Sequence, residues 1–269
     1  MSKAAELAAL IGSQTALSNR NLIINGAMQV AQRGTSFSSN PSNVTRYPVD
    51  RFKAFNSSGA GEATVSQSTE SPDEFVNSIK IDVTTADTNN TGTQEFGIFY
   101  SVEAQDCQHL LYNTSSAKTL TLSFWVKSNK TGTYVTWFYT PDAGDHYSDT
   151  YTINSADTWE KKTITVPAKT SGGGINNDNG TGFQFGWILM AGDNFTSGTF
   201  PTDWETLVNA NRYVDQTVNI LDSTSNEFYL AGVQLEIGEQ ATPFEHRSFG
   251  EELARCQRYY QKTYAYGTA

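Results

Sequence analysis

Cysteine and histidine are scarce in this sequence of 269 residues, and their spacing excludes the common catalytic and metal-binding motifs. Cys107 and Cys256 lie 149 residues apart, which fits neither a disulfide framework nor a zinc motif. The three histidines, His109, His146 and His246, form no H-E-x-x-H pattern. A P-loop, a nucleophile elbow and a dinucleotide-binding fingerprint are also absent. The sequence therefore predicts no catalytic residues, no metal site and no cofactor.

Charged residues are also few, and the positive ones are in the minority. Only 17% of the residues are charged, and 18 Lys and Arg against 28 Asp and Glu give a formal net charge of −10. Nucleic acids and anionic membranes are bound through clusters of Lys and Arg, so neither is expected as a partner. No run of 18 apolar residues occurs, so no membrane-spanning segment is predicted.

In place of charge, the sequence is rich in small polar and strand-forming residues. Ser, Thr and Asn make up 78 of the 269 residues. In the segment 120–126, Leu120, Leu122, Phe124 and Val126 alternate with polar residues, which is typical of a half-buried antiparallel strand. Because no long helix separates the predicted strands, the pattern predicts a mainly β protein, a sandwich or a barrel. The expected strands are residues 22–31, 50–56, 63–67, 78–83, 96–103, 119–127, 134–140, 161–166, 183–190 and 227–235.

A short helix is predicted near the N-terminus, within residues 1–20. Ser2 is a suitable N-cap, and Ala4, Leu7 and Ile11 fall on one helical face. A helix of about ten residues is not stable alone in water. We therefore predict that residues 1–20 are a docking helix and linker that contacts its own domain, a sister chain or another protein. A frayed terminus is the alternative.

A second helix is predicted at the C-terminal end. Ser248 and Glu251 form an S-x-x-E capping box, and the helical pattern continues to about Lys262. This places the boundaries of the β domain at residues 21–247, with residues 248–269 forming the helix and the start of a distal part that is absent from this chain.

One face of the C-terminal helix is apolar. Phe249, Leu253, Cys256 and Tyr260 recur at spacings of four, three and four residues. Such a stripe favours either a helix lying on the sandwich or a short coiled-coil seam between chains. These four residues are therefore the candidates for an oligomer interface.

Aromatic residues are densest between positions 134 and 151. Strand alternation places Trp137 and Tyr139 on one face and Tyr134 on the other, so one face is core and the other is available as an aromatic platform. Sugar rings stack on Tyr and Trp, and neighbouring polar groups bind their hydroxyls. The sequence leaves open whether these rings form a platform or fill the core. The candidate glycan-binding residues are Tyr134, Trp137, Tyr139, Asp145, His146 and Tyr147.

Glycan hydrolysis is a further alternative. It needs two carboxylates held at a defined separation, and the sequence does not pair its acidic residues. We therefore predict that the protein is not an enzyme.

Longer motifs resemble a known group of proteins. Residues 21–36 (NLIINGAMQVAQRGTS) and 47–52 (YPVDRF) resemble the opening of a family of tailed-bacteriophage tail fibres and virion appendages. Residues 121–128 (TLSFWVKS) look like the central strand of carbohydrate-binding-module jelly rolls. The family's closing block is similar to three segments, 227–238 (EFYLAGVQLEIG), 241–247 (ATPFEHR) and 251–260 (EELARCQRYY).

The resemblance implies a jelly-roll β-sandwich with a short N-terminal helix and a C-terminal helix, usually as a homotrimer. It implies a non-catalytic structural protein of the virion tail, assembled in the host cytoplasm and involved in host attachment. Its expected partners are other tail or baseplate proteins, bound through the N-terminal segment, and a host-surface glycan. A glycan-binding receptor-recognition module and a head decoration or head fibre protein are the alternatives. A glycan-degrading enzyme is the least favoured.

Overall fold

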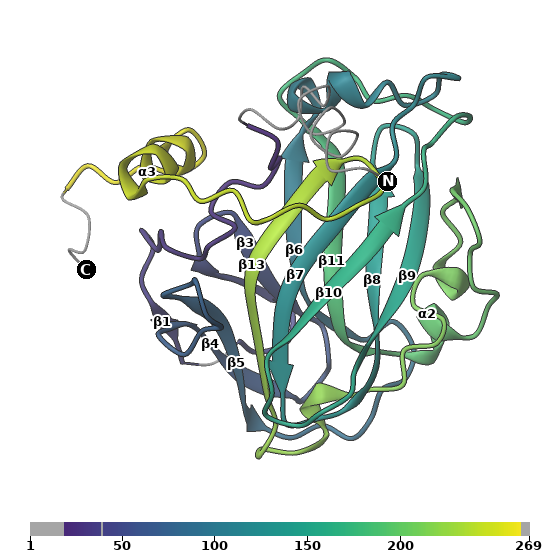
Figure 1. The fold of residues 1–269 in the computed structure, drawn as a ribbon. Coiled ribbons are helices and arrows are strands. Elements are labelled where there is room, and N and C mark those ends of the chain that lie inside the picture. Colours follow the sequence, from purple (N-terminus) through teal and green to yellow (C-terminus); the bar gives the residue numbers. More distant parts are fainter. Residues whose placement is uncertain (1–18, 39, 265–269) are drawn as a thin grey trace, which may run out of the picture.

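The computed structural model describes residues 19–38 and 40–264, and within them the strands form two antiparallel sheets packed face to face (Figure 1). The predicted N-terminal helix lies outside the described residues. One sheet has the order β1-β4-β5-β13-β7-β10, and the other has the order β12-β9-β8-β11-β6-β3-β2. The mainly β jelly-roll sandwich predicted from the sequence is confirmed.

The first sheet consists of β1 (Ser36–Phe37), β4 (Glu62–Ser68), β5 (Ser78–Thr85), β13 (Glu227–Ile237), β7 (Leu120–Ser128) and β10 (Glu160–Val166). The second consists of β12 (Glu205–Thr206), β9 (Asp145–Ile153), β8 (Gly132–Thr140), β11 (Thr181–Ala191), β6 (Glu95–Glu103), β3 (Phe52–Asn56) and β2 (Val44–Val49). We call the second one the seven-stranded sheet. Its position makes it the scaffold of the site described below.

The core lies between the sheets and is built by strand alternation. The alternate residues Leu120, Leu122, Phe124 and Val126 of β7 are all fully buried. Across from them, Trp187 of β11 packs against Phe124 with ring centroids 5.5 Å apart. The alternation predicted from the sequence is therefore correct for β7, but the strand is not half-buried, because Thr121 and Ser123 on its opposite face are buried as well. Large aromatic side chains bring the two sheets together.

The sequence pattern did not predict strands β1, β2, β9 and β12, and one predicted strand is not formed. Residues 22–31, expected to be a strand, form an irregular segment, because Asn25 and Met28 adopt left-handed backbone angles of 65° and 57°. The Asn25 side chain holds this turn by bonding the Val30 amide and carbonyl, each at 2.9 Å. Strand β9 was not predicted, because Asp145, His146, Ser148 and Asp149 interrupt its apolar pattern.

The helices are short and peripheral. Within the described residues they are η2 (Ala104–Leu110), α2 (Asp193–Thr196), η3 (Asn209–Asn211), η4 (Ile220–Asp222) and α3 (Phe249–Gln257). Helix α3 begins as predicted, since the Ser248 hydroxyl accepts a hydrogen bond of 3.3 Å from the Glu251 amide. It ends at Gln257, earlier than the predicted Lys262.

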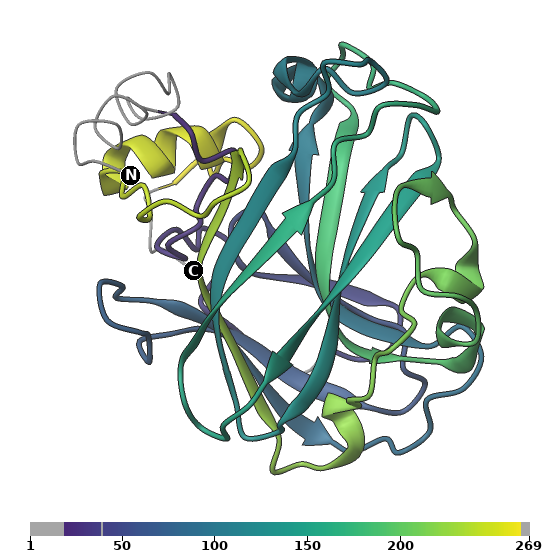
Figure 2. The same ribbon diagram turned by 45° about the vertical axis from the view of Figure 1, so that its right-hand side comes forward.

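The segment that begins at residue 19 and the chain around α3 lie side by side (Figure 2). A buried polar cluster joins these opening and closing blocks of the sequence. Arg247 donates to the carbonyls of Ile23 (2.9 Å) and Asn21 (2.5 Å). The same guanidinium pairs with Glu252 at 3.1 Å and with Glu245 at 3.2 Å. The motifs that carry the family resemblance therefore have a structural role here, because they close the domain.

Acid should weaken one contact of β10 in a specific pH range. Burial opposes ionisation of Glu160, but hydrogen bonds from Lys162, Ser155 and Asn154 outweigh it and lower the pKa of Glu160 from 4.5 to about 2. The ionised carboxylate therefore stabilises the folded state above pH 4.5 and loses this effect as the pH falls through about 2.

We expect Glu160→Gln to be less stable than the unmodified protein near neutral pH, and the difference to shrink as the pH falls from 4.5 to about 2. Urea unfolding midpoints measured across this range test the prediction. A difference that is the same at every pH would contradict it.

Candidate functional site

The outer face of the seven-stranded sheet carries a groove with an aromatic floor. On β8, Trp137 and Tyr139 point outward, while the intervening Phe138 is fully buried in the core between the sheets. Trp137 and Tyr139 stack with ring centroids 5.1 Å apart. Phe99 of β6 meets Trp137 edge to face at 6.5 Å. Alternation along two strands thus places several rings on the outer side of the sandwich, where Trp137 and Phe99 are each 4% exposed.

A glycine allows these rings to lie close together. Gly186 of β11 is paired with both Trp137 and Phe99, so it sits between them. A Cβ atom at Gly186 would lie 2.4 Å from the Phe99 ring. The lack of a side chain at this position is therefore required for Phe99 to lie across the sheet.

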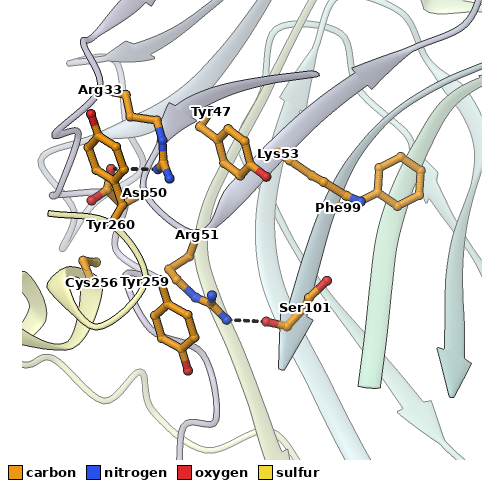
Figure 3. A pocket seen from close by; sticks show the side chains of 10 residues that line it. All are labelled: Arg33, Tyr47, Asp50, Arg51, Lys53, Phe99, Ser101, Cys256, Tyr259 and Tyr260. Carbon is orange, nitrogen blue, oxygen red and sulfur yellow. Dashed lines mark hydrogen bonds and ion pairs between the residues drawn. The ribbon is translucent and has the colours of Figure 1, made fainter. Parts of the chain in front are cut away.

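Two adjoining hollows make up the groove, and they share Lys53 and Phe99. We call them together the sheet groove. The first has a volume of about 280 Å³ and is lined by Thr45, Lys53, Phe55, Glu95, Phe99, Trp137, Gln184 and Arg212. The second, of about 240 Å³, extends towards the end of α3 and is lined by Arg33, Tyr47, Asp50, Arg51, Lys53, Phe99, Ser101, Cys256, Tyr259 and Tyr260 (Figure 3).

One end of the sheet groove is closed by a stacked arginine. The Arg212 guanidinium lies 4.5 Å from the centroid of the Trp137 ring. It pairs with Glu95 at 3.4 Å, and Glu95 also accepts a hydrogen bond of 2.5 Å from Tyr213. The indole nitrogen of Trp137 has no acceptor among residues 19–38 and 40–264.

The opposite end is built by the two-residue turn between β2 and β3. The Asp50 carboxylate accepts a 3.1 Å hydrogen bond from the Gln32 amide and lies 3.7 Å from Arg33. Burial raises the pKa of Asp50, although these contacts oppose the shift. Arg33 in turn stacks on Tyr260 at 3.8 Å and on Tyr47 at 4.5 Å. Cationic and aromatic groups therefore alternate along this end.

The predicted glycan-binding residues separate into two groups. Trp137 lines the sheet groove and Tyr139 stacks on it. Tyr134 and Tyr147 face the other way: Tyr134 is fully buried and stacks on Tyr151 at 5.4 Å, and Tyr147 stacks on Phe138 at 6.0 Å. The structure contradicts a role for Tyr134 as an exposed platform, because its ring fills the core.

Asp145 and His146 are also unsuited to direct contact with a glycan. Asp145 is buried in an ion pair with Lys169 at 2.8 Å. His146 is fully buried, and its Nε2 lies 3.1 Å from Glu205 of β12. Burial lowers the pKa of His146, despite the opposing effect of Glu205. These polar groups hold β9 against Lys169 and β12, so they are engaged within the domain.

The residues of the predicted oligomer seam pack largely against their own domain. Cys256 is 1% exposed and lines the sheet groove, and Tyr260 stacks on Arg33. Leu253 is half-buried, and Phe249 is 44% exposed. The structure contradicts a continuous intermolecular seam of all four residues, because Cys256 and Tyr260 pack against their own domain.

Several lining residues were missed by the sequence reasoning, notably Tyr47, Arg51, Lys53, Phe99 and Arg212. Strand alternation in the sequence did indicate some of them. Alternation along β3 puts Lys53 and Phe55 on the face opposite Ala54, and the strand itself was predicted. In the sheet, β3 lies beside β6, and two strands, β6 and β11, separate it from β8. No local sequence pattern encodes this order.

Other kinds of site were also considered within the described ranges. No group of three or more His, Cys, Asp or Glu residues there is arranged to hold a metal ion. In the same ranges, no helix is long and apolar enough to cross a bilayer.

No known protein family matches the sequence. No curated protein matches it either. Solved structures with a similar fold include the enzymatically active domain of tailspike protein 4 from bacteriophage CBA120, with 12% identity and a TM-score of 0.42 over 81% of this chain. This chain spans only 21% of that tailspike chain.

Carbohydrate-binding modules are similar in fold as well. The family 11 module from Clostridium thermocellum, in complex with a β-1,3-1,4-mixed-linked tetrasaccharide, has 13% identity and a TM-score of 0.37, covering 77% of this chain and 99% of the module. A xylan-binding domain from Paenibacillus barcinonensis has 14% identity and a TM-score of 0.34, covering 65% of this chain and 88% of that domain.

Proposed function

We propose that this chain is a non-catalytic, glycan-binding structural module of a tailed-phage virion appendage that takes part in host attachment. The observation that carries the glycan-binding part is the sheet groove. It combines the rings of Trp137, Phe99 and Tyr47 with polar groups such as Gln184 and Ser101 on one open face of the sandwich. A sugar ring has an apolar CH face that stacks on aromatic rings and hydroxyls that bond to polar side chains.

The non-catalytic part of the proposal is supported by the state of the carboxylates in the groove. Glycoside hydrolysis requires one carboxyl group that donates a proton and a second that acts as base or nucleophile. The groove-lining carboxylates are Glu95 and Asp50. Glu95 is held by Arg212 and Tyr213, and Asp50 by Gln32 and Arg33. Both are engaged in structural contacts, so we assign neither a catalytic role.

Glycan binding is tested by affinity gel electrophoresis in gels that contain bacterial surface polysaccharides or soluble plant and microbial glycans. We expect retention on at least one of them. Tyr47→Ala should weaken that retention about tenfold, since it removes a half-buried ring from the groove and leaves the core intact.

Tyr264→Ala is the matched control, because Tyr264 is 55% exposed and does not line the groove. It should leave retention unchanged. Migration of the unmodified protein that is the same in every gel would contradict the glycan-binding proposal.

The virion location and the homotrimer rest on the sequence resemblance. We propose that the chain is a component of the tail, bound to its neighbours through residues 1–20, with a head decoration or head fibre as the rival location. Antibody labelling of purified particles distinguishes tail from head, and light scattering at micromolar concentration gives the number of chains. Absence of the chain from purified particles would refute the virion proposal, and a monomeric mass would refute the trimer.

A further inference from the structure

The sheet groove differs in charge from the rest of the molecule. Four cationic side chains line it: Arg33, Arg51, Lys53 and Arg212. Only two carboxylates, those of Asp50 and Glu95, lie among the lining residues. The groove therefore has an excess of two positive charges, in a protein whose formal net charge is −10.

Two of the four cations are neutralised within the protein. Arg33 lies 3.7 Å from Asp50, and Arg212 lies 3.4 Å from Glu95. Within residues 19–38 and 40–264, no carboxylate pairs with Lys53 or Arg51. The excess charge of the groove is thus located on these two neighbouring side chains.

Lys53 is the central one, since it borders both hollows of the groove. Its ammonium lies 5.6 Å from the centroid of the Phe99 ring, and the side chain is half-buried. Burial lowers the pKa of Lys53, with Glu95 opposing the shift. Within the described ranges this ammonium donates no hydrogen bond, although it has three N–H groups. An incoming anion therefore stabilises this partly desolvated and unpaired ammonium more strongly than it would stabilise an exposed lysine.

Arg51 is held beside Lys53 in a fixed orientation. Its guanidinium stacks on Tyr259 at 3.5 Å and donates to the Ser101 carbonyl (Figure 3). The residue adopts a left-handed backbone angle of 76°, in a turn where glycine would be unstrained. This position holds an arginine although its backbone is strained, and the arginine places a guanidinium at this edge of the groove. The planar fork of arginine suits bidentate contact with a carboxylate or a phosphate.

We infer that the sheet groove selects acidic saccharides, whose carboxylate or phosphate group is bound by Lys53 and Arg51 while the sugar ring stacks on the aromatic floor. This inference rests on the proposed glycan-binding function and names its ligand class. A uronic acid polymer and a sugar-phosphate polymer both supply the required chemistry. A neutral glycan would leave the two cations without partners.

The test compares each acidic polysaccharide with its own neutral derivative. Polygalacturonate, alginate and hyaluronate are used in affinity gels beside the same polymers after chemical reduction of their carboxyl groups. Ribitol-phosphate teichoic acid represents the phosphate class, and single-stranded DNA represents a polyanion without the matching sugar chain. We expect at least tenfold stronger retention on an acidic polymer than on its reduced form, because a charge-assisted hydrogen bond is lost on reduction. Retention should also fall as salt is added.

Variants of Lys53 and Arg51 test whether the preference for acidic polymers arises from the sheet groove. Lys53→Met keeps the apolar stem on Phe99 and should abolish the preference for the acidic polymer, while Lys53→Arg should retain it. Lys118→Met is the matched control, since Lys118 is exposed and lies outside the lining residues. Arg51→Gly removes the guanidinium and relieves the strained backbone, so it should weaken retention with no loss of folding.

Each result has one meaning. Equal retention on acidic polymers and their reduced forms overturns the inference and leaves glycan binding standing. No retention on any polysaccharide, acidic or neutral, overturns the proposed function itself. Single-stranded DNA retained as strongly as the uronate or phosphate polymers would also overturn the inference, because the groove would then recognise charge without the sugar.

Discussion

Replacing Trp137 with alanine will abolish glycan retention and lower the free energy of unfolding by about 3 kcal/mol. Its ring is 4% exposed and contacts Tyr139, Phe99, Tyr213 and Arg212. Removing it leaves a cavity beneath the groove and withdraws the surface on which Arg212 lies. Urea unfolding measures the stability loss, and affinity electrophoresis at low temperature, where the variant is still folded, measures retention.

Trp159→Ala is the control for this experiment. Trp159 is half-buried beside Tyr229 of the six-stranded sheet, with ring centroids 6.0 Å apart, and it does not line the groove. This variant should keep full glycan retention and lose less stability. Trp137→Phe, which retains an aromatic floor, should recover most of the stability. Undiminished retention by Trp137→Ala would contradict the assignment of the groove.

Replacing Arg247 with methionine will destabilise the domain by about 3 kcal/mol. The guanidinium is 4% exposed and joins Asn21 and Ile23 to Glu245 and Glu252. Its removal leaves the Glu252 carboxylate, which is 7% exposed, without its positive partner. The cost of an uncompensated buried charge exceeds that of the lost packing. Urea unfolding followed by tryptophan fluorescence measures the change.

The same substitution at Arg255, on helix α3, provides the control. Arg255 pairs with Glu251 at 2.9 Å, but both side chains are at least a third exposed, so Arg255→Met should cost about 0.5 kcal/mol or less. A double variant, Arg247→Met with Glu252→Gln, should recover part of the loss because it removes the buried charge. Equal effects of Arg247→Met and Arg255→Met would show that the buried cluster does not close the domain.

Local patterns were sufficient for much of the fold. Period-two alternation identified β7 because its inner residues are aliphatic or aromatic and their neighbours are mostly polar. The capping box at Ser248 and Glu251 located the start of α3, since a cap depends only on residues three apart. The same kind of reasoning failed at β9, where His146 and Asp145 are buried by partners from distant segments, Glu205 and Lys169.

Local sequence patterns predicted only part of the candidate site. Alternation correctly put Trp137 and Tyr139 on the face opposite Tyr134, but it could not say which face is core. The decision depends on the partner sheet, which packs over Tyr134, while the other face is covered by Phe195 and Tyr213 from the chain after β11. The same limit applies to α3, whose apolar stripe suits a neighbouring chain and its own domain equally well until Cys256 is seen to be buried.

The sequence by itself determined the composition of this protein, its strand-rich class, the alternation of its clearest strands and the cap of its last helix, because each depends on residues close together in the chain. The tertiary structure alone decided that Lys53, Phe99, Trp137 and Arg212 line one groove. These residues come from β3, β6, β8 and the loop after η3, and only the order of strands in the sheet brings them together. Long-range pairing sets that order, so the charge and shape of the groove cannot be read from any single segment.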